Sequence, residues 1–300
     1  MENQPRVSDR QAEAQCASAA IVNYNARDHL VACVRSLRRE GVGEIVVADN
    51  SSRDGSEAAL ARSDSEARWL PTGANLGFGA AANRAVAATT GPYVLVLNPD
   101  TVIHPGTIAA LTAALDAEPR LAAVGPQMDN PDGSVYPSAR RFPDLVTATG
   151  HAFVGLIRPD NRFTRRYRML DTDPDRAAAA AGGTSPVDWV SGAAMMVRRS
   201  AFEAVGGFDP SYFMYVEDVD LCWRWRQAQW LVGYTPAGRV THAVGASSRQ
   251  VPYRMIAAHH RSLLRFAVRT TTGAQRLLLP AVAVGLAVRT VAAWVTHRFA

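Results

Sequence analysis

The chain has 300 residues, of which 48% are hydrophobic and 20% are charged, close to the averages of a folded globular protein. This composition excludes a disordered tail, a collagen-like fibre and a small disulfide scaffold, and the length allows one large α/β domain with appendages. The three cysteines form no CxxC pair, which argues against a zinc site or a disulfide framework and favours a reducing compartment.

The basic charge is concentrated at the C-terminal end of the chain. The net charge is +5 and all 32 basic residues are arginines. Residues 249–300 contain eight Arg and neither Asp nor Glu, so this tail carries +8, whereas the remainder holds 24 Arg against 27 acids, or −3. Local basicity of this kind argues against a general nucleic-acid binder and indicates a polyanionic surface at one end of the protein.

Strand–turn–helix units repeat along the first part of the chain. Residues 1–16 are polar and predict a disordered leader rather than a signal peptide. Strands are then predicted at 19–24, 44–49, 93–97 and, more weakly, 68–70, and helices at 28–39, after Gly79 and from about Pro105. This alternation predicts an α/β fold, a mostly parallel sheet flanked by helices. Because ligands bind such sheets at the carboxyl ends of the strands, Tyr24, Asp49 and Asp100 are expected to converge on one crevice.

The second half of the chain is less regular. Residues 138–186 are irregular and Arg-rich and predict a mobile loop, and a short strand is predicted at 231–234. In the tail, Arg254, Arg261, Arg265 and Arg269 recur at helical spacing, with apolar residues on the opposite face.

An apolar run of 12 residues, 277–288, follows the basic helix. It contains Pro280 and Gly285 and is interrupted by Arg289, which makes it a poor membrane span. A cationic amphipathic helix followed by a marginal apolar helix is typical of a segment that lies in an anionic membrane interface. The alternative is a helix pair that docks on the protein's own core.

Three carboxylates, Glu217, Asp218 and Asp220, lie at the start of a predicted helix. Acidic residues are favoured in a first helical turn by the helix dipole, but the apolar and aromatic neighbours here argue against a merely solvated face. A carboxylate in partly apolar surroundings has a raised pKa, which suits a general base. The turn at 206–210 would aim this segment at the crevice.

Other residues suit a nucleotide and a metal ion. Asp100 offers a hard oxygen ligand for Mg²⁺ or Mn²⁺ bridging a diphosphate, and His242 could ligate the metal or contact phosphate. Asp49 could accept a hydrogen bond from the imide of a uracil or thymine ring, or brace the turn that follows it. Tyr24 could stack on the base or belong to the core. The run 75–79 has glycines that let backbone approach a ribose-phosphate, but it lacks a dinucleotide fingerprint, and the chain has no P-loop lysine.

Taken in this order, the motifs resemble the inverting glycosyltransferases of family 2, which have a GT-A-type fold. The resemblance runs from Ala19 to about Ser248 and rests on 22–25, 47–56, 75–79 with Asn83 and Arg84, 97–100, 189–192, 206–209, 215–224 and His242. The sequences of residues 206–209 and 213–224, followed by His242, are similar to those of the rhamnosyltransferase branch.

The resemblance implies a role for each matching residue. Tyr24 and Asp49 would bind the nucleotide base, and Asp100 would bind the divalent metal, with His242 as a possible further ligand. Asp218 would deprotonate the acceptor hydroxyl. The nucleotide-sugar site would also contain Asn75, Gly77, Asn83, Arg84 and Asn98. Glu217 and Asp220 would position the acceptor. The acceptor side would be lined by Trp189, Ser191, Gly192 and Arg224. The family's metal motif often has two acids, whereas the first position here is Asn98, which leaves one firm carboxylate ligand.

The resemblance implies a GT-A-type domain over 17–248, with a nucleotide-sugar half (17–130) and an acceptor half (131–248). The composition adds a leader (1–16) before it and a basic membrane-associating tail (249–300) after it. The branch implies dTDP-L-rhamnose as donor, Mg²⁺ or Mn²⁺, and a polyprenyl-diphospho-N-acetylglucosamine acceptor of arabinogalactan linker synthesis at the cytoplasmic face of the plasma membrane. The alternatives are a family 2 transferase with another donor, such as a UDP-hexose, and a non-catalytic membrane-bound nucleotide-sugar-binding protein. A processive synthase is disfavoured because its several membrane helices and Trp motif are not visible, and a nucleotidyltransferase because residues 21–27 have no glycine-rich basic loop. The oligomeric state and the choice of base among the three carboxylates stay open.

Overall fold

The computed structural model describes residues 17–142, 178, 183–243 and 252–298. The leader predicted at 1–16 and most of the loop predicted at 138–186 lie outside the described residues. At the edges of that loop, β8 (Ala139–Arg140) pairs with β10 (Trp189–Val190), and β9 (Ser185–Val187) joins the main sheet.

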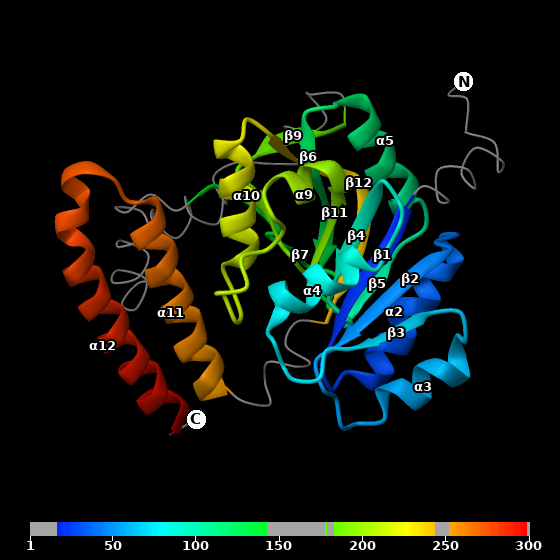
Figure 1. The fold of residues 1–300 in the computed structure, drawn as a ribbon, viewed down its shortest axis with the longest axis horizontal. Helices are drawn as coiled ribbons and strands as arrows, with labels where there is room; N and C mark the ends of the chain where they lie inside the picture. Colours follow the sequence, from blue (N-terminus) through cyan, green and yellow to red (C-terminus); the bar gives the residue numbers. More distant parts are fainter. Residues whose placement is uncertain (1–16, 143–177, 179–182, 244–251, 299–300) are drawn as a thin grey trace.

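A ten-stranded mixed sheet forms the centre of the described part of the chain (Figure 1), with a main path in the order β3-β2-β1-β4-β11-β6-β12-β5. Its strands are β1 (Ala17–Asn23), β2 (Glu44–Asp49), β3 (Arg68–Pro71), β4 (Tyr93–Leu97), β5 (Thr101–Ile103), β6 (Leu121–Asp129), β7 (Val135–Tyr136), β9, β11 (Ala194–Arg198) and β12 (Leu231–His242). β3, β2, β1 and β4 are parallel, as are β6 and β12, whereas β11 runs antiparallel to both of its neighbours. The predicted α/β fold with a mostly parallel sheet is confirmed.

Helices cover both faces of the sheet, because the buried strands alternate their side chains between two apolar cores. In β1, Ala19 and Ile21 face one core and Ala20 and Val22 the other. The helices are α2 (Arg27–Arg39), α3 (Ser56–Ser63), α4 (Phe78–Ala87), α5 (Thr107–Ala117), α9 (Arg199–Ala204), α10 (Glu217–Gln227), α11 (Pro252–Thr270), the 3-10 helix η2 (Gly273–Leu278) and α12 (Leu279–Arg298).

The structure extends the predicted strands in two ways. β12 continues beyond the predicted 231–234 to His242, since its pairing with β6 resumes at Arg239 after a register shift that spans Pro236 and Gly238. β6 and β11, which the sequence analysis did not predict, lie in the middle of the sheet. β11 is an Ala- and Met-rich run, a composition with weak strand preference that tertiary packing overrides.

The C-terminal helices α11 and α12 lie side by side and antiparallel at one end of the molecule (Figure 1). The indole of Trp294 donates to the carbonyl of Tyr253, at 3.1 Å, and the His260 ring is 2.7 Å from the Thr290 hydroxyl. Residues 273–291 are long and apolar enough to cross a membrane, by length and composition, and none is buried in the structure. α12 continues through Pro280, Gly285 and Arg289, the three residues for which the sequence analysis predicted a poor membrane span.

Gly77 lies where the loop before α4 meets the segment before α10. Its φ is +85°, and a Cβ built on it would lie 2.0 Å from the carbonyl oxygen of Phe213. The amide of Phe78 donates a hydrogen bond to that same oxygen, at 3.1 Å. A side chain at position 77 would therefore force the two segments apart.

We expect Gly77→Ala to lower the free energy of unfolding by about 3 kcal/mol, because a clash with backbone adds to left-handed strain. Gly73→Ala is the matched control, since its φ is +81° but no atom lies within 4 Å of its Cβ. The control should cost about 1 kcal/mol, the left-handed strain alone. Chemical denaturation followed by circular dichroism measures both, and equal losses would contradict the close approach of Gly77 to Phe213.

Candidate functional site

The carboxyl ends of β1, β2 and β4 lie side by side, as the sequence predicted. Asn23 at the end of β1 pairs with Asp49 at the end of β2, and β4 flanks β1 on the other side. Asp49 is buried, and its Oδ1 accepts hydrogen bonds from the Asn23 amide (2.9 Å) and the Ser52 hydroxyl (2.5 Å). Its Oδ2 accepts from the backbone N–H of Ser52, at 2.9 Å. Asp49 thus braces the turn that follows β2, next to the half-buried Tyr24.

Asn50 joins this turn to the glycine-rich loop, a role that the sequence analysis missed. Its amide donates to the carbonyl of Gly77 at 3.0 Å, and its Oδ1 accepts from the N–H of Leu76 at 3.3 Å. Asn75 is exposed in the same loop, with its Oδ1 accepting the N–H of Gly77. The exposed Arg84 reaches back from α4 and donates to the carbonyl of Thr72, at 3.0 Å. The structure therefore brings together most of the residues predicted for the nucleotide.

Asn98, Asp100 and His242 come together at the ends of β4 and β12. The Nε2 of His242 lies 3.1 Å from the Oδ1 of Asp100 and 3.4 Å from the Asn98 amide nitrogen. Asp100 and His242 are both buried, and the Nδ1 of His242 has no hydrogen-bond partner among the described residues. The Tyr136 ring packs edge-on against the His242 ring, with centroids 6.4 Å apart.

These side chains fit a divalent ion as partial ligands. Two neighbouring ligands of an octahedral ion at about 2.1 Å stand roughly 3 Å apart, close to the spacing of the Asp100 oxygen and the His242 nitrogen. Within the described residues, no group of three or more His, Cys, Asp or Glu side chains could hold a metal by itself. An ion held here would therefore take its remaining ligands from a bound phosphate group and water, the usual arrangement for Mg²⁺.

The second cluster lies at the start of α10. Tyr215 and Val216 precede the helix with φ of +66° and +70°, a left-handed conformation that costs about 1–3 kcal/mol for each non-glycine residue. α11 holds this strained segment in place. The hydroxyl of Ser262 donates to the carbonyl of Met214 at 3.0 Å, and the His259 ring packs against Tyr215 with centroids 5.2 Å apart.

Burial raises the pKa of both carboxyls that follow this segment. The pKa of Glu217 is raised well above its ordinary value by burial and then by the charge of Asp218, and its Oε2 has no partner among the described residues. Burial also raises the pKa of Asp218, against the opposing effects of two backbone N–H groups and the charge of Arg140. Those N–H groups belong to Gly192 (2.9 Å) and Val219 (2.8 Å). The half-buried Asp218 is the more accessible of the two.

A short backbone segment connects the two clusters. Gly192 donates its N–H to Asp218, and the adjacent Ala193 accepts the N–H of Asn98 on its carbonyl oxygen, at 3.0 Å. A Cβ at position 192 would lie 3.2 Å from the Cβ of Asp218, so the glycine permits this approach. The general-base candidate and the metal-ligand candidates thus contact neighbouring residues of one loop.

Three of the predicted site residues are instead used for internal contacts. The Asn83 amide is bonded on both sides to the backbone of Phe208, at 2.8 Å each. The fully buried Asp220 pairs with Arg224 (2.7 Å) and with Arg269 of α11 (2.9 Å). Arg224 also donates to the carbonyls of Val205 and Gly207, at 2.6 and 2.7 Å. These contacts leave Asn83, Asp220 and Arg224 as parts of the scaffold that holds α10.

The predicted acceptor side lies next to Asp218. Ser191 is half-buried and directly precedes Gly192. Trp189 is buried, and its indole donates to the carbonyl of Arg141 at 2.9 Å. The guanidinium of Arg140 lies 5.1 Å from the centre of the Trp189 ring, which holds a positive charge beside the carboxylates. Arg140 was missed by the sequence analysis because it falls in the segment predicted to be mobile.

The chain is similar in sequence to known glycosyltransferases. The family model described as Glycosyl transferase family 2 matches residues 18–206. The N-acetylglucosaminyl-diphospho-decaprenol L-rhamnosyltransferase of Mycobacterium tuberculosis (strain H37Rv) is 41% identical over 258 residues, which are 82% of this chain and 81% of that protein. The rhamnosyltransferase WbbL of Escherichia coli (strain K12) is 40% identical over 83 residues, 28% of this chain and 31% of that protein.

Solved structures share the fold. A mannosyltransferase from Pyrobaculum calidifontis, in complex with GDP-Man and Mn²⁺, superposes with a TM-score of 0.58 at 16% identity, covering 93% of this chain and 75% of that one. GalNAc-T7 with UDP, GalNAc and Mn²⁺ gives 0.56 at 15% identity, covering 78% of this chain and 44% of that one. Both likenesses support the GT-A fold. With the match over residues 18–206 and the extended identity to a rhamnosyltransferase, the chain belongs to glycosyl transferase family 2 and is a glycosyltransferase.

Proposed function

We propose that the protein is an inverting rhamnosyltransferase that moves L-rhamnose from dTDP-L-rhamnose to a polyprenyl-diphospho-N-acetylglucosamine, a step in arabinogalactan linker synthesis. The observation that carries the proposal is the connection of Asp218 to the Asn98–Asp100–His242 group through Gly192 and Ala193. A base and a diphosphate-binding centre are the two groups that a single displacement at an anomeric carbon requires. The identity to the mycobacterial enzyme supports the choice of donor and acceptor.

Asp218 acts as the base in this proposal. Its carboxylate takes the proton of the acceptor hydroxyl while that oxygen attacks the anomeric carbon from the face opposite the diphosphate. Glu217 is more deeply buried, and this burial together with the charge of Asp218 raises the pKa of Glu217, which favours Asp218 as the carboxylate that ionises. Asp220 is not the base, because two arginines neutralise it.

The other side of the site binds the donor. Tyr24 and Asp49 bind the thymine ring of the nucleotide, and Asn75, Gly77 and Arg84 lie along the ribose and diphosphate. Asp100 and His242, with Asn98 beside them, hold a divalent ion, Mg²⁺ or Mn²⁺, which when bound offsets the negative charge that develops on the leaving diphosphate. Arg84 adds a fixed positive charge on the same side.

The α11–α12 hairpin attaches the enzyme to the cytoplasmic face of the plasma membrane. Residues 249–300 contain eight arginines and no acid, which favours an anionic leaflet. Leu277, Val284 and Val288 are 83%, 65% and 62% exposed, an apolar surface suited to lipid. A lipid-linked acceptor stays in the bilayer, so the enzyme must reach it there.

Asp218→Asn should lower kcat for rhamnose transfer by roughly 10²- to 10⁴-fold, because the amide cannot accept the proton. Labelled dTDP-rhamnose and a short-chain polyprenyl-diphospho-N-acetylglucosamine are the substrates. Glu217→Gln, isosteric with a protonated Glu217, is the matched control and should retain most of the activity. A severe loss in Glu217→Gln with activity retained in Asp218→Asn would assign the base to Glu217.

The pH profile gives an independent test. The base must be ionised, so kcat/KM falls as pH decreases through the pKa of Asp218. Because burial raises that pKa, the acidic limb should lie above pH 3.8, the ordinary value for aspartate. Initial rates across pH 3–8, with folding checked by circular dichroism, locate the limb. A rate that stays constant down to the ordinary pKa of an aspartate would contradict the assignment.

Removal of divalent metal should weaken binding of dTDP at least about tenfold, since diphosphate binding loses its counter-charge. Asp100→Ala should show the weak binding at all times and lose its response to a chelator. Asp132→Ala, which removes an exposed acid whose carboxylate bonds to Ser134 rather than to this group, is the control. Calorimetric titration of dTDP with and without a chelator measures this, and wild-type binding insensitive to the chelator would contradict the metal site.

A further inference from the structure

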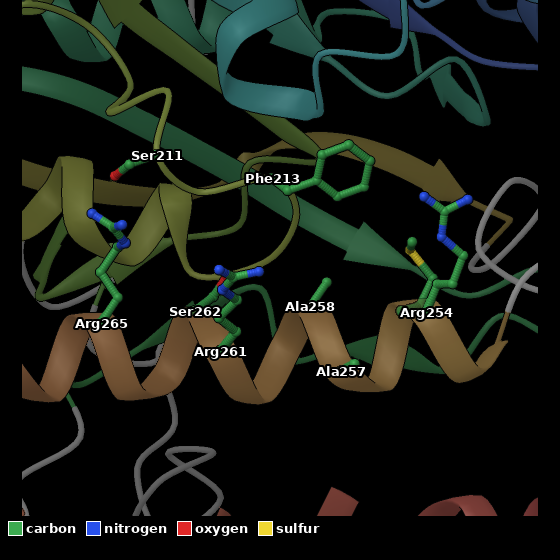
Figure 2. Close-up of a pocket in the computed structure, with 9 residues that line it drawn as sticks. Ser211, Phe213, Arg254, Ala257, Ala258, Arg261, Ser262 and Arg265 are labelled. Atoms are coloured by element: carbon green, nitrogen blue, oxygen red, sulfur yellow. The ribbon is translucent and has the colours of Figure 1, made fainter. Parts of the chain in front are cut away.

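A second cavity lies outside the site described above, between α11 and the segment that leads into α10 (Figure 2). Its volume is about 380 Å³. It is lined by Ser211, Phe213, Arg254, Met255, Ala257, Ala258, Arg261, Ser262 and Arg265. Figure 2 shows the arginines extending from the side of α11 that faces Ser211 and Phe213. The lining contains three cations and no acid, so it suits an anion.

These arginines differ from their neighbour Arg269 on the same helix. Arg269 is paired with Asp209 (2.8 Å) and Asp220 (2.9 Å). Within the described residues, Arg254 and Arg261 form no ion pair, and Arg265 lies over the Tyr212 ring at 5.8 Å from its centre. All three are exposed at the cavity. Like charges gathered on one face repel one another, and a bound polyanion reduces that repulsion.

The spacing of the arginines suits a diphosphate in particular. Arg261 and Arg265 are one helical turn apart, which sets their Cβ atoms about 6 Å apart on one face. Guanidinium groups bind phosphate oxygens through two parallel N–H bonds, so adjacent arginines can each take one of two linked phosphates. Arg254 lies on the same face further along α11, where it extends the positive surface beyond the diphosphate.

The cavity lies between the α11–α12 hairpin and the segment that leads to Asp218. The backbone of Phe213 contacts Gly77 and Phe78 of the donor side. Phe213 also lines the cavity, opposite α11. The chain runs from this wall through Tyr215 and Val216 to Asp218. On the opposite side of α11 stands α12, with its exposed apolar residues. A ligand in the cavity thus lies between a lipid-compatible surface and the proposed base.

We propose that Arg261 and Arg265, with Arg254 beside them, bind the diphosphate group that joins the sugar of the acceptor to its polyprenyl chain. This inference rests on the proposed function and adds the subsite that recognises the lipid-linked acceptor. The diphosphate sits in the cavity, the prenyl chain passes along the α11–α12 hairpin toward the bilayer, and the single sugar ring extends toward Asp218. Arg261 and Arg265 act as binding residues and take no part in proton transfer.

The test uses the full-length protein in detergent and a short-chain acceptor, citronellyl-diphospho-N-acetylglucosamine, which needs no membrane. Loss of one charge-assisted contact should raise the dissociation constant of this acceptor about tenfold in Arg261→Gln and in Arg265→Gln. Calorimetric titration measures it without any donor, so it remains informative if rhamnose is not the transferred sugar. Arg276→Gln, an exposed arginine on η2 outside the cavity, is the matched control and should bind as wild type.

A second acceptor separates the diphosphate from other anions. Octyl N-acetylglucosaminide has the sugar and an apolar chain but no diphosphate, so the arginine variants and wild type should bind it equally. Equal weakening for both acceptors would overturn the proposal. If the variants bind the diphosphate acceptor as wild type does but bind phosphatidylglycerol vesicles more weakly, the arginines are a membrane contact and the proposal is wrong. If the variants bind dTDP more weakly, the arginines belong to the donor side and the proposal is also wrong.

Discussion

The arrangement of the site depends on the ion pairs that the buried carboxylate of Asp220 forms with two arginines. This carboxylate is fully buried and pairs with Arg224 of its own helix and Arg269 of α11, while the Tyr212 hydroxyl lies 3.2 Å away. Arg224 in turn holds the carbonyls of Val205 and Gly207. Removing one partner of such a buried pair costs about 3–5 kcal/mol, because the remaining charge is left without compensation. One carboxylate thereby fixes α10 to the turn before it and to the C-terminal helix.

This assignment of Asp220 explains how three carboxylates within four residues have different chemistry. Asp220 is neutralised by arginines, Glu217 is buried with an unpartnered oxygen, and Asp218 is half-buried with two backbone N–H groups on its oxygens. Burial raises the pKa of both Glu217 and Asp218, and the charge of Asp218 raises that of Glu217 further, which suits Asp218 as the base. The left-handed residues Tyr215 and Val216 help, because they turn the chain sharply just before the helix and aim its first turn at Gly192.

The sequence predicted the first half of the sheet closely and the second half poorly. β2 and β4 match their predicted bounds because each is a short run of β-branched and Leu residues between polar turns. β6 and β11 were missed since Ala- and Met-rich strands carry no clear period. In the site, β1 lies between β2 and β4, so the end of β2 at Asp49 and the end of β4 before Asp100 lie at the same edge of the sheet, as predicted. The scaffold roles of Asn83 and Arg224 depend on the backbone of residues 205–208, a long-range contact that spacing along the chain does not encode.

The basic face of α11 shows the same limit of sequence patterns and also what the fold adds to them. Helical spacing placed Arg254, Arg261, Arg265 and Arg269 together as one cationic stripe for a membrane. The structure divides that stripe, because Arg269 turns inward to Asp220 while the other three face a cavity. α11 therefore braces the helix that carries Asp218 and forms the wall of a candidate anion site at once. An anion bound by Arg261 and Arg265 would restrain α11 against residues 211–213, and through Ser262 and Arg269 that restraint reaches the strained segment before the proposed base. If the proposed subsite binds the acceptor, a single helix would couple acceptor binding to the positioning of the proposed base.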